Sequence, residues 1–254
     1  MRTKEFYHLL AKMNILKELG YVLKPESMIL DFGCGEGRSV QELRGLGYQA
    51  FGCDIRFTNK ESKDIQLMYN ENIIRLINTH PYKLPFEDST FDFIFSDQVF
   101  EHVQNYSETI SELKRILKPD GCCLHIFPSR YGPIESHKYV PFSSIIKSYS
   151  WLLFWAKMGI RKKSQAGLSA TEIANQNYNF LKNNTNYLSK KQITKEFKKY
   201  FKTVLYCENL FLKHSRKGRH VYFLSKIFTF LPSIFSTLRV RVLFTAQPNK
   251  LQLT

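Results

Sequence analysis

Three glycines alternate directly behind an aspartate near the start of the chain, in the stretch 28–37 (MILDFGCGEG). Asp31 closes an apolar run that predicts a short buried strand. The residues that follow, RSVQELR, have helical character, so the chain passes from strand to helix through a turn of bare backbone. Backbone N–H groups without side chains can approach a ligand closely, and we therefore expect a ligand at the turn of Gly33, Gly35 and Gly37.

The spacing of these glycines distinguishes between two kinds of ligand. A dinucleotide fingerprint requires Gly-x-Gly-x-x-Gly, but the third glycine, Gly37, comes one position too early because position 38 is Arg. An acidic residue followed by alternating glycines instead resembles the first motif of class I S-adenosylmethionine-dependent methyltransferases. The resemblance implies that Asp31 faces the amino group of S-adenosylmethionine and that the glycine backbone passes under its methionine and ribose parts. The alternative is a plain strand-to-helix turn.

A second acidic residue ends the next predicted strand, 48–53 (YQAFGC). Asp54 follows Gly37 by 17 residues, which is close to the spacing at which an acid meets a ribose diol. The two oxygens of a carboxylate match the two ribose hydroxyls. In this interpretation Ile55 or Arg56 lies near the adenine face. The alternative role for Asp54 is that of a helix N-cap.

The segment 80–103 carries a second resemblance. Its run LPFEDSTFDFIFS resembles the middle motif of the type-11 methyltransferase family, which implies that Asp97 and Gln98 end the fourth strand beside the transferred methyl group. The family commonly has an acid at the position of His80 to hold the adenine amino group. The next residue here is Pro81, which has no N–H to offer the ring. Either the loop shifts so that Asn78 and Thr79 take this role, or adenine is held mainly by packing; His80 stays a candidate cofactor-binding residue.

Acidic and imidazole side chains occur together at two places on the acceptor side. Glu101-His102 matches the usual ending of the family's middle segment, and His102 is either a catalytic base or a packing residue. The loop 127–142 contains Glu135 and His137, in a pattern similar to that of bacterial methyltransferases from cell-surface polysaccharide gene clusters. A sugar hydroxyl has a pKa far above 7, so O-methylation would gain from His137 as general base, held by Glu135. The alternative is ordinary loop polarity.

Both motifs occur in order, and the resemblance covers residues 28–128. It implies a three-layer Rossmann-like α/β fold with a mostly parallel seven-stranded sheet, an antiparallel last strand and a helical insert after strand five. We expect an N-terminal helix in 1–25, a cofactor-binding core in 26–128, an acceptor-side loop and helical insert in 129–200, and strands six and seven in 201–254. Residues 220–236 predict one apolar, aromatic helix.

The charge of the chain is large and uneven. The formal net charge is +15, and residues 161–220 contain fourteen Lys and Arg against three Glu. Such a surface attracts an anionic acceptor, for example a nucleotide-linked or lipid-linked sugar, or a membrane surface. The apolar segment 143–160 precedes a basic run, so it is a lid, a membrane-surface helix or an ordinary packed helix.

Composition limits the remaining possibilities. No apolar run reaches the roughly 18 residues of a spanning helix, and the charged N-terminus does not resemble a signal peptide. The five cysteines show no metal-ligand spacing, so we expect reduced thiols, no metal site and a cytoplasmic protein. The basic half leaves two locations open, free in the cytoplasm or peripheral at the inner membrane surface. Two other functions stay open. One is methylation of a nucleic acid, RNA in particular, although no Asn-Pro-Pro-Tyr-like motif follows the fourth strand. The other is a non-catalytic cofactor-binding module.

Overall fold

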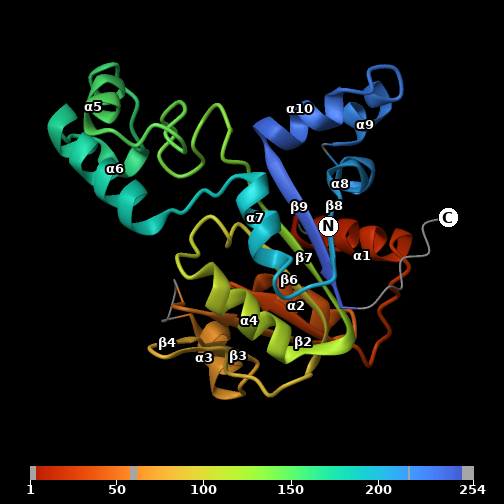
Figure 1. Cartoon of the computed structure of the whole chain (residues 1–254). Coiled ribbons are helices and arrows are strands. Elements are labelled where there is room, and N and C mark those ends of the chain that lie inside the picture. The colour runs from red at the N-terminus through yellow and green to blue at the C-terminus, as the bar shows by residue number, and fades with distance from the viewer. Residues whose placement is uncertain (1–3, 58–61, 217, 248–254) are drawn as a thin grey trace.

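A computed structural model describes residues 4–57, 62–216 and 218–247 (Figure 1). The described residues do not include 1–3 of the predicted N-terminal part, 248–254 of the predicted C-terminal part, or Lys217 of the basic segment. The strands are β1 (Met28–Phe32), β2 (Gln49–Asp54), β3 (Ile74–Leu76), β4 (Asn78–Thr79), β5 (Tyr82–Lys83), β6 (Phe91–Asp97), β7 (Leu117–Pro128), β8 (Thr203–Tyr206) and β9 (Val240–Ala246). The helices are α1 (Lys4–Glu18), α2 (Arg38–Gly45), α3 (Lys63–Asn70), α4 (Tyr106–Ile116), α5 (Tyr149–Lys157), the 3₁₀ turn η1 (Lys163–Gln165), α6 (Ala170–Asn184), α7 (Lys190–Phe197), α8 (Glu208–His214), α9 (Arg219–Ser225) and α10 (Leu231–Leu238).

A seven-stranded sheet in the order β3-β2-β1-β6-β7-β9-β8 forms the centre. The pairs among β3, β2, β1, β6 and β7 are parallel, while β9 is antiparallel to both β7 and β8. The predicted mostly parallel seven-stranded sheet with an antiparallel last strand is confirmed. The short β4–β5 ribbon forms a separate sheet that the sequence did not predict.

Two apolar clusters cover the two faces of this sheet. Successive strand residues point to opposite faces, so Ile29 of β1 lies in one cluster and Leu30 in the other. Helices α1, α2 and α3 contribute to the first cluster, and helices α4 and α7 to the second. The sheet is therefore the middle of three layers, as expected.

The insert after β7 forms a helical pair of its own, in which α5 and α6 pack through Leu152, Ala174 and Leu181. In Figure 1 this pair extends away from the sheet, opposite the C-terminal helices α9 and α10. The prediction of one helix over 220–236 was wrong: α9 ends at Ser225 and a second helix begins at Leu231, because Pro232 is accepted in the first turn of a helix but not in its interior. Within the described residues, no helix has both the length and the apolar character needed to cross a bilayer.

Candidate active site

The glycine turn follows β1, and its three glycines have different surroundings. Gly33, Gly35 and Gly37 all have left-handed backbone, with φ of +80°, +53° and +70°. A Cβ atom on Gly33 would lie 2.3 Å from a methyl of Val99, and one on Gly37 would lie 2.7 Å from the methyl of Met68. A Cβ atom on Gly35 would meet nothing within 4 Å. Packing therefore requires two of the glycines, and the third faces open space.

That space is a cleft of about 1000 Å³. Its walls include Gly35 of the turn, Asp97 at the end of β6 and Gln98, which follows this strand. Gln98 also has left-handed backbone, with φ of 57°, which is uncommon for a residue other than glycine and is often found at functional sites. The far wall comes from the C-terminal helices, with Phe211, Val221, Phe235 and Arg239. The cleft thus joins the glycine turn to the C-terminal part of the chain.

Asp54 lies beside the glycine turn because β1 and β2 are parallel neighbours. Its Oδ2 accepts a hydrogen bond from the Gly35 amide at 2.9 Å, and its Oδ1 accepts one from the Arg56 amide at 3.2 Å. The next helix, α3, has Ser62 at its N-cap position, so Asp54 does not cap it. Ile55 follows with 60% of its side chain exposed. The geometry places a carboxylate next to the open glycine.

Two further carboxyl groups lie near the ends of β1 and β6. Asp31 is buried, and its pKa is raised to about 8, chiefly because burial disfavours the charge and also because the charge of Asp97 is near. The Asp97 Oδ2 accepts a hydrogen bond from the Lys12 Nζ at 2.6 Å. Lys12 comes from α1 and is fully buried, with its ammonium group 4.8 Å from the centre of the Phe95 ring. Helix α1 therefore brings a cation to the inner edge of the cleft.

Sequence reasoning did not identify Lys12. The sequence did contain a signal, because Lys12 lies on the same face of α1 as Leu9 and Leu16, which are apolar and buried. A lysine in an apolar stripe needs a buried anionic partner. The missing information was which strand end would supply the anion.

His80 lies between the short strands β4 and β5. It lies exposed in the turn of the β4–β5 ribbon, where its Nδ1 is 3.1 Å from the Thr79 hydroxyl oxygen. Its backbone amide donates to the Asn78 side-chain oxygen at 3.1 Å. Of the predicted cofactor residues, the lining of the cleft described above includes Gly35, Asp97 and Gln98; it does not include Asp31, Gly33, Gly37, Asp54, Ile55 or His80.

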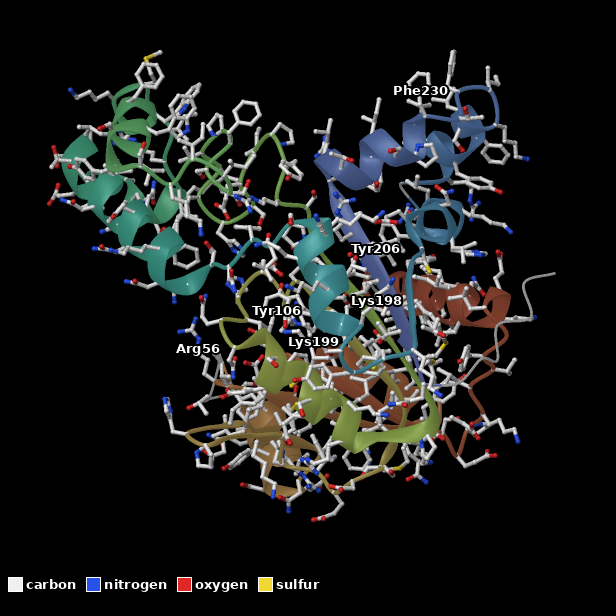
Figure 2. All side chains as sticks on the ribbon, viewed as in Figure 1. Arg56, Tyr106, Lys198, Lys199, Tyr206 and Phe230 are labelled. Carbon is white, nitrogen blue, oxygen red and sulfur yellow. The ribbon has the colours of Figure 1, made fainter. Side chains whose placement is uncertain are left out.

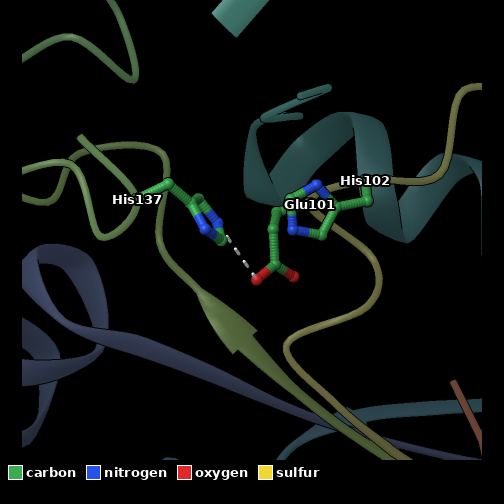
Figure 3. Close-up of side chains that lie close together, drawn as sticks. All are labelled: Glu101, His102 and His137. Atoms are coloured by element: carbon green, nitrogen blue, oxygen red, sulfur yellow. Dashed lines mark ion pairs between the residues drawn. The ribbon is translucent and has the colours of Figure 1, made fainter. Parts of the chain in front are cut away.

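Three side chains from two loops meet beyond the ends of β6 and β7, as Figure 3 shows. Glu101 and His102 follow β6, and His137 follows β7. The His137 Nε2 lies 3.9 Å from the Glu101 Oε1, and the centres of the two imidazole rings are 4.6 Å apart. The His102 Nδ1 lies 2.6 Å from the Asn184 carbonyl oxygen. We refer to Glu101, His102 and His137 as the Glu-His-His cluster.

Burial controls the charges in this cluster. Desolvation raises the pKa of Glu101 to about 8, and the negative charge of Glu135 adds to the effect. The pKa of His137 is lowered, again mainly by burial, although the charge of Glu135 opposes the shift. A neutral imidazole and an unusually basic carboxyl group are therefore brought together.

The predicted pair of Glu135 and His137 is close in space, but the Glu135 carboxylate bonds to the backbone. Its Oε2 accepts hydrogen bonds from the amides of His137 at 3.0 Å and Lys138 at 2.6 Å. Its Oε1 accepts one from the Tyr187 hydroxyl at 2.7 Å. Glu135 thus fixes the loop that carries His137, and the carboxyl group that faces the His137 ring belongs to Glu101.

Comparison with known proteins identifies the domain. A family model described as a methyltransferase domain matches residues 30–125. The sterol 24-C-methyltransferase of Schizosaccharomyces pombe is 28% identical over 106 residues, which cover 39% of this chain and 27% of that protein. The demethylmenaquinone methyltransferase of Bacillus cereus (strain AH187) is 27% identical over 158 residues, covering 51% of this chain and 62% of the relative. The chain therefore spans less than two thirds of the length of these curated relatives.

Solved structures agree on the fold. Haemonchus contortus phosphoethanolamine N-methyltransferase 2, solved with S-adenosyl-L-methionine, gives a TM-score of 0.52 at 17% identity and covers 92% of this chain and 51% of that chain. Geranyl diphosphate methyltransferase, solved with GPP and sinefungin, gives a TM-score of 0.50 at 14% identity and covers 94% of this chain and 77% of that chain. Residues 30–125 therefore match a methyltransferase domain family, and together with the strand order and the glycine turn this match supports a class I S-adenosylmethionine-dependent methyltransferase of the type-11 family.

Proposed function

We propose that this chain methylates a hydroxyl group of a small-molecule acceptor, a sugar in cell-surface polysaccharide or glycolipid biosynthesis. The observation that carries the proposal is the position of the Glu-His-His cluster. It lies at the same edge of the sheet as the glycine turn, and Asp97 is near enough to raise the pKa of both Asp31 and Glu101. Cofactor-binding and acceptor-binding groups thus adjoin at the carboxyl ends of the strands, where ligands bind in open α/β sheets.

The residues at the glycine turn fit S-adenosylmethionine. Gly35 leaves an open cradle that a Cβ atom would enter, Asp54 offers a carboxylate for the ribose hydroxyls, and Asp31 offers a carboxyl oxygen that can accept from the ammonium group. The bound cofactor supplies an electrophilic methyl group on a sulfonium. Since that methyl is already activated, the main task of the protein is to position the acceptor oxygen and to remove its proton.

His137 is our candidate for removing that proton. Its lowered pKa keeps the imidazole neutral near pH 7, and its Nε2 is buried without a hydrogen-bond partner in the described part of the chain. The acceptor proton would pass to Nε2 as the C–O bond forms and the C–S bond breaks. Glu101 lies close enough to stabilise the resulting imidazolium, and Glu135 holds the loop.

Four cations surround this loop and support an anionic acceptor. The charges of these cations act on one another or on His137, and the residues are Arg130, Lys138, Lys147 and Lys162. Burial lowers the pKa of Lys138 and of Lys147, the neighbouring cations lower it further, and the charge of Glu135 opposes both shifts. The phosphate groups of a nucleotide-linked or lipid-linked sugar would complement this charge.

The C-terminal helices support peripheral contact with a membrane. We define the α9–α10 arm as residues 219–238. Figure 2 shows Phe230 at its outer end, directed away from the sheet. The arm also carries the exposed cations Arg219 and Lys226. Its exposed large apolar side chains are Phe223, Leu224, Ile227, Phe228, Phe230, Ile234 and Leu238. Apolar residues flanked by cations match an anionic lipid surface, on which a lipid-linked acceptor would be met.

A methyl-transfer screen tests the proposed reaction. The full chain is incubated with methyl-labelled S-adenosylmethionine and with nucleotide sugars, glycolipids, quinone precursors or RNA. We expect transfer to a phosphorylated sugar and a loss of about 10²–10⁴-fold in turnover for His137→Ala, with unchanged cofactor affinity. His220→Ala, an exposed imidazole on α9, is the control. Transfer to RNA, or full turnover in His137→Ala, would contradict the proposal.

A further inference from the structure

We infer that the Glu-His-His cluster is a binding site for a divalent transition-metal cation. Its three possible ligand atoms, one from each side chain, all lie within 4.8 Å of one another. Nitrogen and oxygen ligands that share an ion at 2.0–2.2 Å are roughly 3–3.5 Å apart. Closing the cluster around an ion therefore needs side-chain shifts of about 1 Å.

Unpaired buried atoms point to a ligand at this place. Within the described residues, both Glu101 oxygens and the His137 Nε2 are buried and have no hydrogen-bond partner. The Glu101 side chain has no solvent exposure at all. Buried polar atoms are almost always paired, because leaving a carboxylate without a partner is strongly unfavourable. A cation between Glu101 and His137 would satisfy these atoms together.

The orientation of His102 fits the same interpretation. A carbonyl oxygen only accepts, so the 2.6 Å contact with Asn184 places the hydrogen on the His102 Nδ1. The Nε2 lone pair is then free to coordinate. Metal-bound histidines commonly donate their other ring N–H to a backbone carbonyl in this way, which fixes the tautomer and the ring orientation.

The ligand set indicates the class of ion. Two imidazoles and one carboxylate suit Zn²⁺, Co²⁺, Mn²⁺ or Fe²⁺, whereas Mg²⁺ prefers oxygen ligands and retains its waters. Three protein ligands leave at least one position open for an oxygen of the acceptor. The sequence showed no metal-ligand spacing because the ligands come from two loops, with His137 35 positions after His102.

The binding of the ion does not depend on the proposed function, but its role in turnover does. With an ion in place, the His137 Nε2 is a ligand. Activation of the acceptor hydroxyl then passes from the imidazole to the cation, which polarises a bound oxygen. The two descriptions of His137 therefore differ in whether methyl transfer requires a metal.

Titration of the full chain with Co²⁺ after chelator treatment and dialysis tests the site. We expect one Co²⁺ per chain, absorption typical of nitrogen and oxygen ligands, displacement by Zn²⁺ and no displacement by equimolar Mg²⁺. Glu101→Gln should weaken Co²⁺ binding about 100-fold or more, because losing even a residue that only hydrogen-bonds to a metal ligand often weakens metal affinity about 10–100-fold. Since a buried substitution can disturb folding, His102→Ala, at a less buried ligand, is the second variant, and we expect the same loss. Glu18→Gln removes a carboxylate that lies 2.6 Å from the His214 Nε2, and it should leave binding unchanged.

The outcomes separate the two proposals. Absence of saturable Co²⁺ binding, equal binding by Glu101→Gln, His102→Ala and the wild type, or thiolate charge-transfer bands from the cysteines would each overturn the metal site. If Co²⁺ binds as expected and no acceptor is methylated in its presence, the metal site stands and the proposed reaction fails. If methylation is found but no ion binds and chelators have no effect, the reaction stands with His137 as base.

Discussion

Replacing Gly35 by alanine should weaken cofactor binding while leaving the fold intact. The new Cβ atom meets no other atom of the protein within 4 Å, so it protrudes into the cleft rather than into the packed interior. A methyl group forced into a well-fitted contact typically costs about 1–3 kcal/mol, which corresponds to a 5- to 150-fold weaker affinity for S-adenosylmethionine. Valine at the same position should remove measurable binding altogether.

The effect of Gly35→Ala on stability should be small. At φ of +53° an L-residue adopts the left-handed helical conformation, which costs about 1 kcal/mol relative to glycine. For a chain of this length that corresponds to a decrease of about 2–4 °C in the melting temperature. Gly47→Ala is the matched control, because Gly47 also has positive φ, at +89°, and open space around its Cβ position, but it lies in an exposed turn after α2.

Calorimetric titration with S-adenosylmethionine, paired with thermal unfolding, measures both quantities. We expect the two variants to unfold at similar temperatures and only Gly35→Ala to lose affinity. Wild-type affinity in Gly35→Ala, or equal losses in both variants, would show that the cofactor does not lie over this glycine. Gly33→Ala provides a further contrast, because its Cβ would collide with Val99, and we expect it to lose mainly stability.

Three other predictions concern buried charge and the exposed arm. Lys12→Met should lower the free energy of unfolding by about 2 kcal/mol in urea titrations, because it leaves Asp97 unpaired. Lys199→Met, at an exposed ion pair, is the control and should change the free energy of unfolding by less than about 0.5 kcal/mol. Equal changes in the two variants would show that Lys12 has no special structural role. Asp31 keeps its proton up to about pH 8 when folded but releases it near pH 4 when unfolded, so it should make the wild type less stable as pH rises between these values. Asp31→Asn should remove roughly 1 kcal/mol per pH unit of that slope in urea unfolding at pH 5 and pH 8, and a slope equal to that of the wild type would refute the raised pKa. Ile227→Ser on the α9–α10 arm should weaken sedimentation with phosphatidylglycerol vesicles, whereas Phe154→Ser on α5 should not; the reverse result would assign membrane contact to the insert.

The sequence was most informative where a motif and its structure are local. The turn after β1 could be predicted because Asp31 and the three glycines are adjacent in the chain and each glycine adopts positive φ. Asp54 could be assigned to the same site because parallel neighbouring strands end at one edge of the sheet. Both inferences need only strand direction and spacing.

Contacts between distant segments were less predictable. Glu135 was paired with His137 because the two are close in sequence, yet the carboxyl group facing the ring comes from Glu101, on a loop after a different strand. Lys12 could be recognised as unusual in its helix, but no local rule connects it to Asp97, 85 positions away. The expected helix over 220–236 gave too much weight to apolar composition and too little to Pro232.

The place of β9 in the sheet has a consequence for synthesis of the protein. This strand is among the last parts of the described chain to leave the ribosome, yet it lies between β7 and β8 and bonds to both. Until residue 246 emerges, one edge of β7 lacks its permanent neighbour and β8 has no strand to join. A nascent or prematurely terminated chain would therefore present an unpaired, apolar strand edge, which is a common starting point for aggregation and for capture by chaperones.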